Sequence, residues 1–127
     1  MPVDDQDLDA AASRYARELG AVAGVPPILD AVHLGLGADG HTASLIPGDA
    51  VLDVRDRDVA VTQPYQGHRR MTLTYPALDR ARCRVWLVTG GGKSRALRQL
   101  IDGDRSVPAG RVNARDATVF TEEALLA

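Results

Sequence analysis

The sequence predicts an α/β protein built on a layered, mostly parallel sheet with flanking helices. Helix-like and strand-like segments alternate along the chain, which is typical of this class. The longest apolar strand, at residues 83–89, has few polar alternations, which favours burial on both faces of a parallel sheet. The chain has 127 residues, enough for one core and too few for two, so we expect a single domain over residues 1–127.

The first predicted elements are a helix and a strand. Asp4 or Asp5 is suited to cap the helix, because an aspartate side chain accepts hydrogen bonds from the first free N–H groups. Gly20 and the Gly-Val-Pro-Pro segment at 24–27 end the helix, and a strand follows near 30–36. The apolar residues of the helix fall at helical spacing: Leu8, Ala12, Tyr15 and Leu19.

Further strands and helices are predicted downstream. Runs rich in β-branched residues at 58–62 and 71–74 indicate short strands, and residues 83–89 indicate a longer one. The glycines at 90–92 then open a helix, and a last strand at 117–120 precedes a short terminal helix. The apolar residues of the middle helix are Leu97, Leu100 and Ile101. In this class, ligands bind in loops at the carboxyl ends of the strands.

Composition and charge narrow the class of protein. The formal net charge is −2, which gives no electrostatic footprint for nucleic acid. No apolar run approaches the roughly 18–20 residues that span a bilayer, and the start of the sequence shows neither region of a signal peptide. The single cysteine, Cys83, fits a reducing compartment. We therefore expect a soluble, cytoplasmic protein with no nucleic-acid or membrane partner.

Residues 35–48 are the most informative stretch of the sequence. They follow an apolar run and begin Gly-Leu-Gly-Ala-Asp-Gly-His, which predicts a strand entering a glycine-rich turn. Gly37 and Gly40 supply flexible backbone and N–H groups that favour an anion at close range. Asp39 and His41 add an acid and an imidazole, and histidine acts as a base near neutral pH. A phosphate cradle beside a general base predicts hydrolysis or isomerisation of a phosphorylated small molecule.

The sequence partly matches two nucleotide-binding motifs, but neither match is complete. Residues 35–40 match Gly-x-Gly-x-x-Gly, but the Pro-Gly pair at 47–48 leaves no room for the long helix of a dinucleotide site. The Gly-Lys-Ser at 92–94 resembles the end of a P-loop, but that motif needs glycine where this chain has Leu87. The sequence therefore predicts a site for a single phosphate group at Lys93, which follows three glycines at the start of a helix.

Other polar residues fit ordinary structural roles. His33 lies in an apolar strand and is expected to be a core histidine, and His68 is expected in a solvated loop. Arg55 and Arg57 alternate with aspartates and are expected to pair with them at the surface. Ser44 lacks the Gly-x-Ser-x-Gly turn of a nucleophile. The histidines and the cysteine show no metal-ligand spacing, so we expect neither a metal nor another cofactor.

Four segments resemble the 6-phosphogluconolactonase family, and they occur in the family's order. Residues 37–48 resemble its signature, 70–78 its Arg-x-Thr-Leu-Thr segment, 86–93 its Val-Thr-Gly-x-x-Lys segment and 107–111 its Pro-Ala-Ser segment. Glucosamine-6-phosphate deaminases share the superfamily, but after Asp-Gly-His they continue Phe-Asn-Glu-Pro, whereas this chain continues Thr-Ala-Ser-Leu-Ile-Pro. The resemblance implies the NagB/RpiA/CoA-transferase-like fold.

The resemblance covers only the C-terminal half of the family's domain. The family's Gly-Gly-Ser/Thr phosphate loop and its Asp-Glu-Arg segment, which lie earlier, have no counterpart in this sequence. We therefore expect a partial domain whose sheet exposes an edge and an apolar face, and which is a poor enzyme alone. Such a surface favours self-association as a homodimer, or association with a missing N-terminal half.

The resemblance also implies a reaction, the metal-free hydrolysis of 6-phospho-D-glucono-1,5-lactone in the oxidative pentose phosphate pathway. In the mechanism that it implies, His41 takes the proton of the attacking water, and Asp39 orients or stabilises the imidazole. N–H groups around Gly37 and Gly40 help to hold the developing oxyanion.

The same implied mechanism assigns Arg70 and Lys93 to the phosphate of the substrate. Three alternatives stay open. One is a sugar-phosphate isomerase or deaminase that uses the same His41 for ring opening. The second is a non-catalytic sugar-phosphate binding module, and the third is a fragment that binds nothing.

Overall fold

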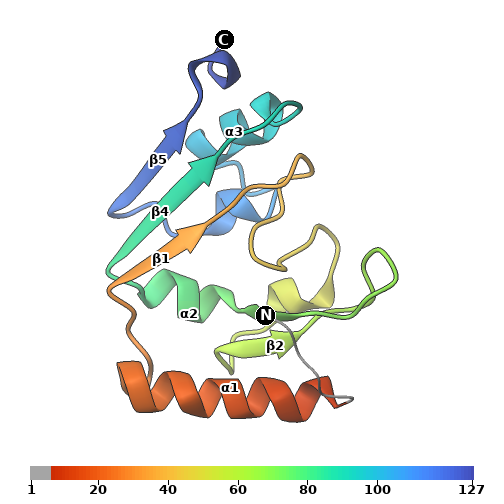
Figure 1. Ribbon diagram of the computed structural model, residues 1–127, viewed down its shortest axis with the longest axis vertical. Coiled ribbons are helices and arrows are strands. Elements are labelled where there is room, and N and C mark those ends of the chain that lie inside the picture. The colour runs from red at the N-terminus through yellow and green to blue at the C-terminus, as the bar shows by residue number, and fades with distance from the viewer. Residues whose placement is uncertain (1–6) are drawn as a thin grey trace.

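A computed structural model describes residues 7–127 of the chain. Its main sheet consists of three parallel strands in the order β1-β4-β5. These strands are β1 (Ala31–Leu34), β4 (Cys83–Val88) and β5 (Ala117–Thr121). Helices lie beside the sheet (Figure 1), so the predicted α/β class with a parallel sheet and flanking helices is confirmed.

The two short β-branched runs form strands, but they pair apart from the main sheet. β2 (Val59–Val61) and β3 (Met71–Leu73) make an antiparallel ribbon. The first helix, α1 (Leu8–Ala23), packs against this ribbon beside β2 (Figure 1). The ribbon therefore lies between α1 and the rest of the domain.

The helix α1 has an aspartate cap, as predicted, but at a different residue. The side chain of Asp7 accepts a hydrogen bond from the backbone N–H of Ala10 at 3.1 Å. The predicted caps, Asp4 and Asp5, lie outside the described residues. The helix ends before Gly24, whose φ of 94° falls in the left-handed region, so this glycine stops the helix as predicted. The stop predicted at Gly20 is wrong, because Gly20 lies within the helix.

Further helices follow the later strands. The helix α3 (Ser94–Ile101) comes after the glycines at 90–92 as predicted, and the short terminal helix is the 3-10 turn Glu123–Leu125. The sequence pattern gives no sign of α2 (Tyr75–Arg80), because 6 residues are too few to display a helical period. No helix in the described part of the chain is long and apolar enough to cross a bilayer.

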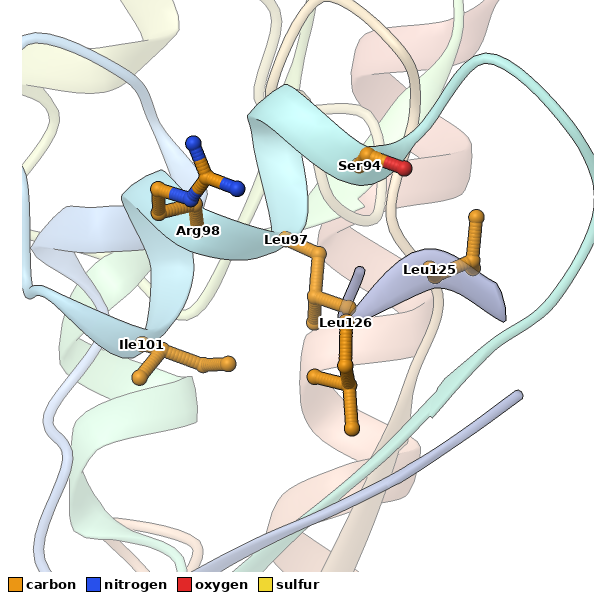
Figure 2. A pocket seen from close by; sticks show the side chains of 6 residues that line it. All are labelled: Ser94, Leu97, Arg98, Ile101, Leu125 and Leu126. Carbon is orange, nitrogen blue, oxygen red and sulfur yellow. The ribbon is translucent and has the colours of Figure 1, made fainter. Parts of the chain in front are cut away.

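The C-terminal turn packs against α3, and the two enclose a pocket of about 150 Å³ (Figure 2). Leu125 of the turn is only 7% exposed. The guanidinium of Arg98 points away from Leu125 and Leu126 in Figure 2. The pocket is therefore lined mainly by apolar groups. The pocket is lined by Ser94, Leu97, Arg98, Ile101, Leu125 and Leu126.

The core lies on one face of the parallel sheet. Val32, Trp86 and Val88 are buried in it, and residues of α2 and α3 belong to the same cluster. On the other face, Leu87 is 50% exposed and Phe120 57%, and the strand register pairs them side by side. The predicted burial of β4 on both faces is therefore wrong, because the described part of the chain covers one face only.

His33 is also on the exposed face of the sheet. Along β1, Ala31 and His33 are exposed whereas Val32 and Leu34 are buried. Side chains alternate across a strand, so a sheet covered on one side buries every second residue. The prediction of a core histidine at position 33 is wrong for this reason.

The buried charged residue of β4 is Arg84, which is 2% exposed. One guanidinium nitrogen, Nη1, donates to the carbonyls of Leu78 at 3.1 Å and Ala81 at 2.8 Å, at the end of α2. The other, Nη2, donates to the carbonyl of Arg115. Because the last carbonyls of a helix have no partner within the helix, Arg84 caps α2 from inside the core.

Candidate active site

The glycine-rich turn that follows β1 is closed by its own hydrogen bonds. The N–H of Gly37 donates to the carbonyl of His41 at 2.9 Å, and the N–H of Gly40 donates to the carbonyl of Gly37 at 3.0 Å. The buried hydroxyl of Thr42 donates to the carbonyl of Gly35 at 2.8 Å and fastens the turn to the end of the strand. The backbone around the histidine is therefore fixed on both sides.

Gly37 is required by a close approach of side chains. A Cβ at this position would lie 2.2 Å from Nδ1 of His41 and 2.8 Å from Oδ1 of Asp39. Any side chain here would displace one of these groups. The N–H groups of Gly37 and Gly40, to which the family resemblance assigns an oxyanion, donate within the turn instead.

Gly40 is required by a different neighbour. Its φ is 85°, and a Cβ there would lie 2.6 Å from Cβ of Val107. The carbonyl of Gly40 accepts the N–H of Ala109 at 2.9 Å. The segment at 107–109, which is distant in the sequence, thus packs against the turn and is hydrogen-bonded to it.

His41 and Asp39 form a close, partly exposed pair within the turn. Nδ1 of His41 lies 2.6 Å from Oδ1 of Asp39, and the side chains are 33% and 40% exposed. Burial acts to raise the pKa of Asp39, but the hydrogen bonds from the backbone and ring of His41 outweigh it and hold this pKa below its usual value. An ionised carboxylate only accepts hydrogen bonds, so Nδ1 carries the proton and the lone pair of a neutral ring is at Nε2.

Tyr65 joins this pair, although nothing in the sequence analysis selected it. Its hydroxyl lies 3.5 Å from Oδ2 of Asp39, and its ring centroid lies 6.1 Å from that of His41. The guanidinium carbon of Arg70 lies 5.5 Å from the centroid of the same ring. Tyr65 thus connects the predicted base to one predicted phosphate ligand. The only signal in the sequence is an aromatic residue alone in a polar loop.

The loop that carries Tyr65 and Arg70 is tied to the His41 turn. It connects β2 to β3, and the N–H of Gln63 within it donates to Oδ2 of Asp49 at 3.0 Å. Nearby, the N–H of Ser44 donates to the hydroxyl of Thr72 at 3.1 Å. These two bonds hold the β2–β3 ribbon against the turn.

Lys93 lies at the same edge of the sheet as His41. It is the half-buried N-cap residue of α3, which begins after β4. Because β1 and β4 are parallel neighbours, the loops that leave their carboxyl ends share one edge (Figure 1). The structure thus brings Asp39, His41, Tyr65 and Arg70 into one cluster and sets Lys93 on the adjoining loop.

Of the other polar residues, some occupy the places that the sequence predicts and one does not. His68 is exposed in a loop, as predicted, and Nε of Arg57 lies 3.1 Å from Oδ1 of Asp56, also as predicted. The prediction for Arg55 is wrong. Its guanidinium donates to carbonyls of its own loop and lies 5.4 Å from the ring centroid of Tyr75, a partner distant in the sequence.

This arrangement is suited to proton transfer beside a bound anion. His41 offers a basic nitrogen, and Arg70 and Lys93 offer positive charge at the same edge. Within residues 7–127, no three or more His, Cys, Asp or Glu side chains are grouped in a way that would hold a metal ion.

Known proteins resemble this chain along most of its length. The family model described as glucosamine-6-phosphate isomerases/6-phosphogluconolactonase matches residues 1–121. A 6-phosphogluconolactonase of Rattus norvegicus is 36% identical over 131 aligned residues, covering 98% of this chain and 49% of the rat protein. The chain spans about half the length of the curated relatives it matches.

Solved structures of related proteins also resemble this chain along most of its length. The 6-phosphogluconolactonase from Trypanosoma cruzi superposes with a TM-score of 0.79 and 29% identity, over 97% of this chain and 54% of that one. A monomeric glucosamine-6-phosphate deaminase of the NagB superfamily superposes with a TM-score of 0.77 over 96% of this chain and 55% of that one. Its 19% identity establishes a common fold alone.

Proposed function

Since this chain belongs to the glucosamine-6-phosphate isomerase/6-phosphogluconolactonase family, we propose that it hydrolyses 6-phospho-D-glucono-1,5-lactone to 6-phosphogluconate. The observation that carries the proposal is the 2.6 Å contact between Nδ1 of His41 and Oδ1 of Asp39. That contact leaves Nε2 as the basic nitrogen of the neutral ring. The choice of substrate is supported by relatives that are named 6-phosphogluconolactonase.

In the proposed reaction, a water molecule attacks the lactone carbonyl while Nε2 of His41 takes its proton. The bond between the carbonyl carbon and the ring oxygen then breaks. The imidazolium returns the proton to that oxygen, which becomes a hydroxyl group. Asp39 keeps the ring in one tautomer and offsets its positive charge between the two steps. General base catalysis of this kind accelerates a reaction about 10²–10⁴-fold.

The phosphate of the substrate is assigned to Arg70 and Lys93. The guanidinium binds phosphate through two parallel hydrogen bonds, and the ammonium adds a point charge. Binding at this remote group positions the carbonyl at the histidine and contributes to the rate through orientation. Tyr65 positions both ends of the site, because it contacts Asp39 and lies under Arg70.

The proposal places the protein in the oxidative pentose phosphate pathway, to which hydrolysis of this lactone belongs. It also places it in the cytoplasm, where a lone thiol such as Cys83 stays reduced.

The test compares the chain with its His41→Gln variant in a lactone hydrolysis assay, measured above the spontaneous rate. Glutamine has a similar size but no basic nitrogen, so we expect the acceleration to fall by about two to four powers of ten. The matched control is His68→Gln, since His68 is exposed in a loop, and its rate should be unchanged. A His41→Gln variant with the full rate would overturn the proposal.

Two further readouts separate the alternatives. Binding of 6-phosphogluconate without acceleration of lactone hydrolysis would identify a non-catalytic sugar-phosphate module. Release of ammonia from glucosamine 6-phosphate would identify a deaminase. The absence of all three signals from a folded sample would leave only the fragment that binds nothing.

A further inference from the structure

Three arginines line a second pocket, formed by residues other than those of the His41 cluster. Its volume is about 290 Å³, and it lies between the loop at residue 55, the start of α2 and the segment 105–111. The whole chain carries a net charge of −2, so three guanidinium groups in one cavity oppose the average charge of the protein. The pocket is lined by Arg55, Tyr75, Pro76, Asp79, Arg105 and Arg111.

Two of the guanidinium groups are held in place by backbone carbonyls. Nη1 of Arg55 donates to the carbonyls of Leu52 at 2.7 Å and Val54 at 3.0 Å. Nε of Arg111 donates to the carbonyl of Arg105 at 2.8 Å. The ion pairs in the described part of the chain form elsewhere, and none of them includes these three arginines. The guanidinium groups of Arg55 and Arg111 are therefore held in place but keep unused donors, and no ion pair among the described residues occupies that of Arg105.

The floor of the pocket is neutral. The guanidinium carbon of Arg55 lies 5.4 Å from the ring centroid of Tyr75, whose hydroxyl donates to the carbonyl of Pro108 at 2.8 Å. Burial raises the pKa of Tyr75 to about 12, so this hydroxyl adds no negative charge.

The lining contains one carboxylate, and it already has a partner. Oδ1 of Asp79 accepts the backbone N–H of Asn113 at 2.8 Å. Three arginines against one aspartate leave the pocket with an excess of positive charge.

We propose that this pocket binds a small phosphorylated anion. Guanidinium groups match the geometry of phosphate oxygens and bind them through paired hydrogen bonds. A phosphate also neutralises more of the excess charge than a single carboxylate does. The cavity is close to the lower end of ligand sites, about 300 Å³, so it fits a ligand of the size of pyrophosphate or a sugar phosphate. The site is additional to the one proposed for the lactone.

The test uses inorganic pyrophosphate as the probe and the Nε–H resonances of the pocket arginines as the readout, in a titration followed by NMR. We expect saturable shifts with a Kd below about 1 mM. Arg105→Gln should weaken binding about tenfold or more, since it removes a charged donor from the pocket. Arg105 is exposed and its hydrogen bond to Arg111 uses its backbone carbonyl, so the variant keeps the fold. Arg55→Gln is a second, independent test.

A variant with the opposite effect sharpens the test. Asp79→Asn keeps an oxygen for the N–H of Asn113 and removes the negative charge, so it should tighten binding. The matched control is Arg82→Gln. Arg82 is exposed and pairs with Asp30 at 3.4 Å, outside the pocket, so pyrophosphate binding should not change.

Three results would overturn the proposal. The first is the absence of saturable shifts in the wild-type chain. The second is equal weakening by Arg82→Gln and Arg105→Gln, because only the overall charge would then matter. The third is loss of binding in Arg70→Gln with no loss in Arg105→Gln, which would move the anion to the site beside His41.

Discussion

Oδ1 of Asp39 accepts two hydrogen bonds from His41, one from Nδ1 at 2.6 Å and one from the backbone N–H at 3.0 Å. A single oxygen therefore fixes both the backbone and the ring of a residue two positions ahead. The ring cannot turn over without losing one of these bonds, so Nε2 keeps its direction.

This pair should make stability depend on pH in the acid range. An aspartate in the unfolded chain takes up its proton at about pH 3.9, whereas the His41 bonds lower the pKa of Asp39 in the folded protein. As the pH falls through 3.9, the unfolded state binds the proton first. The stabilisation is therefore complete above the unfolded pKa and is lost as the pH falls toward the folded pKa. We expect the denaturation midpoint of Asp39→Asn to vary less with pH in this interval than that of the wild type. Identical pH dependence would show that the pair contributes nothing.

Gly37→Ala should abolish most of the activity without unfolding the protein. Its Cβ would lie 2.2 Å from Nδ1 of His41, so the imidazole must move, and a displacement of this kind costs about a hundredfold in rate. The matched control is Gly35→Ala, because a Cβ there meets nothing within 4 Å. Lactone hydrolysis and circular dichroism of both variants check the prediction. Equal activities for the two would contradict it.

Replacing Arg70 or Lys93 by alanine should weaken binding of 6-phosphogluconate by about 1–3 kcal/mol, the range for charged hydrogen bonds. The rate of hydrolysis of unphosphorylated gluconolactone should be nearly unchanged, since this substrate has no phosphate for these cations to bind. Calorimetry and the hydrolysis assay measure the two effects. Arg69→Ala is the control, because its Nε donates to the carbonyl of Thr62 at 3.3 Å. If hydrolysis of the phosphorylated and of the unphosphorylated lactone slows equally, these residues act at the carbonyl or stabilise the fold.

Arg84→Met should lower the free energy of unfolding by about 3 kcal/mol. Methionine fills much of the space but leaves buried carbonyls at the end of α2 without donors, at about 1–3 kcal/mol each. Denaturant unfolding measures the change. Arg82→Met is the control, since its side chain is 71% exposed and substitutions there change stability by about 0.5 kcal/mol at most. Similar losses in both variants would refute the capping role of Arg84.

The exposed face of the sheet should make the chain self-associate. Leu87 and Phe120 lie side by side on it and are about half exposed. Paired apolar side chains on an open sheet favour association. Light scattering should report a dimer for the wild type and a monomer for the double variant Leu87→Lys and Phe120→Lys. Val22→Lys, on α1, is the control because Val22 is 86% exposed away from this face. A monomeric wild type would contradict the prediction.

The parts of the fold that the sequence predicts are those with local causes. The strands at 31–34 and 83–88 follow from apolar runs, and the start of α3 follows from the glycines before it. The turn that holds His41 and Asp39 follows from residues adjacent in the chain. Propensity and spacing act over a few residues, so they are sufficient for these features.

The missed features depend on distant partners. Tyr65 matters because Asp39 lies beside it, Arg55 stacks on Tyr75, and Arg84 is buried because the end of α2 meets it in space. The error at His33 has the same origin, since an apolar strand does not reveal how many of its faces are covered. No local pattern encodes these contacts.

The support beneath Gly40 bears on how the protein is made. The N–H of Ala109 supports the turn that carries His41, yet Ala109 is synthesised long after His41. At about 5–20 residues per second the delay is several seconds. A nascent chain that ends before Ala109 therefore contains both residues of the His41–Asp39 pair but lacks the bond that supports their turn from the segment at 107–109.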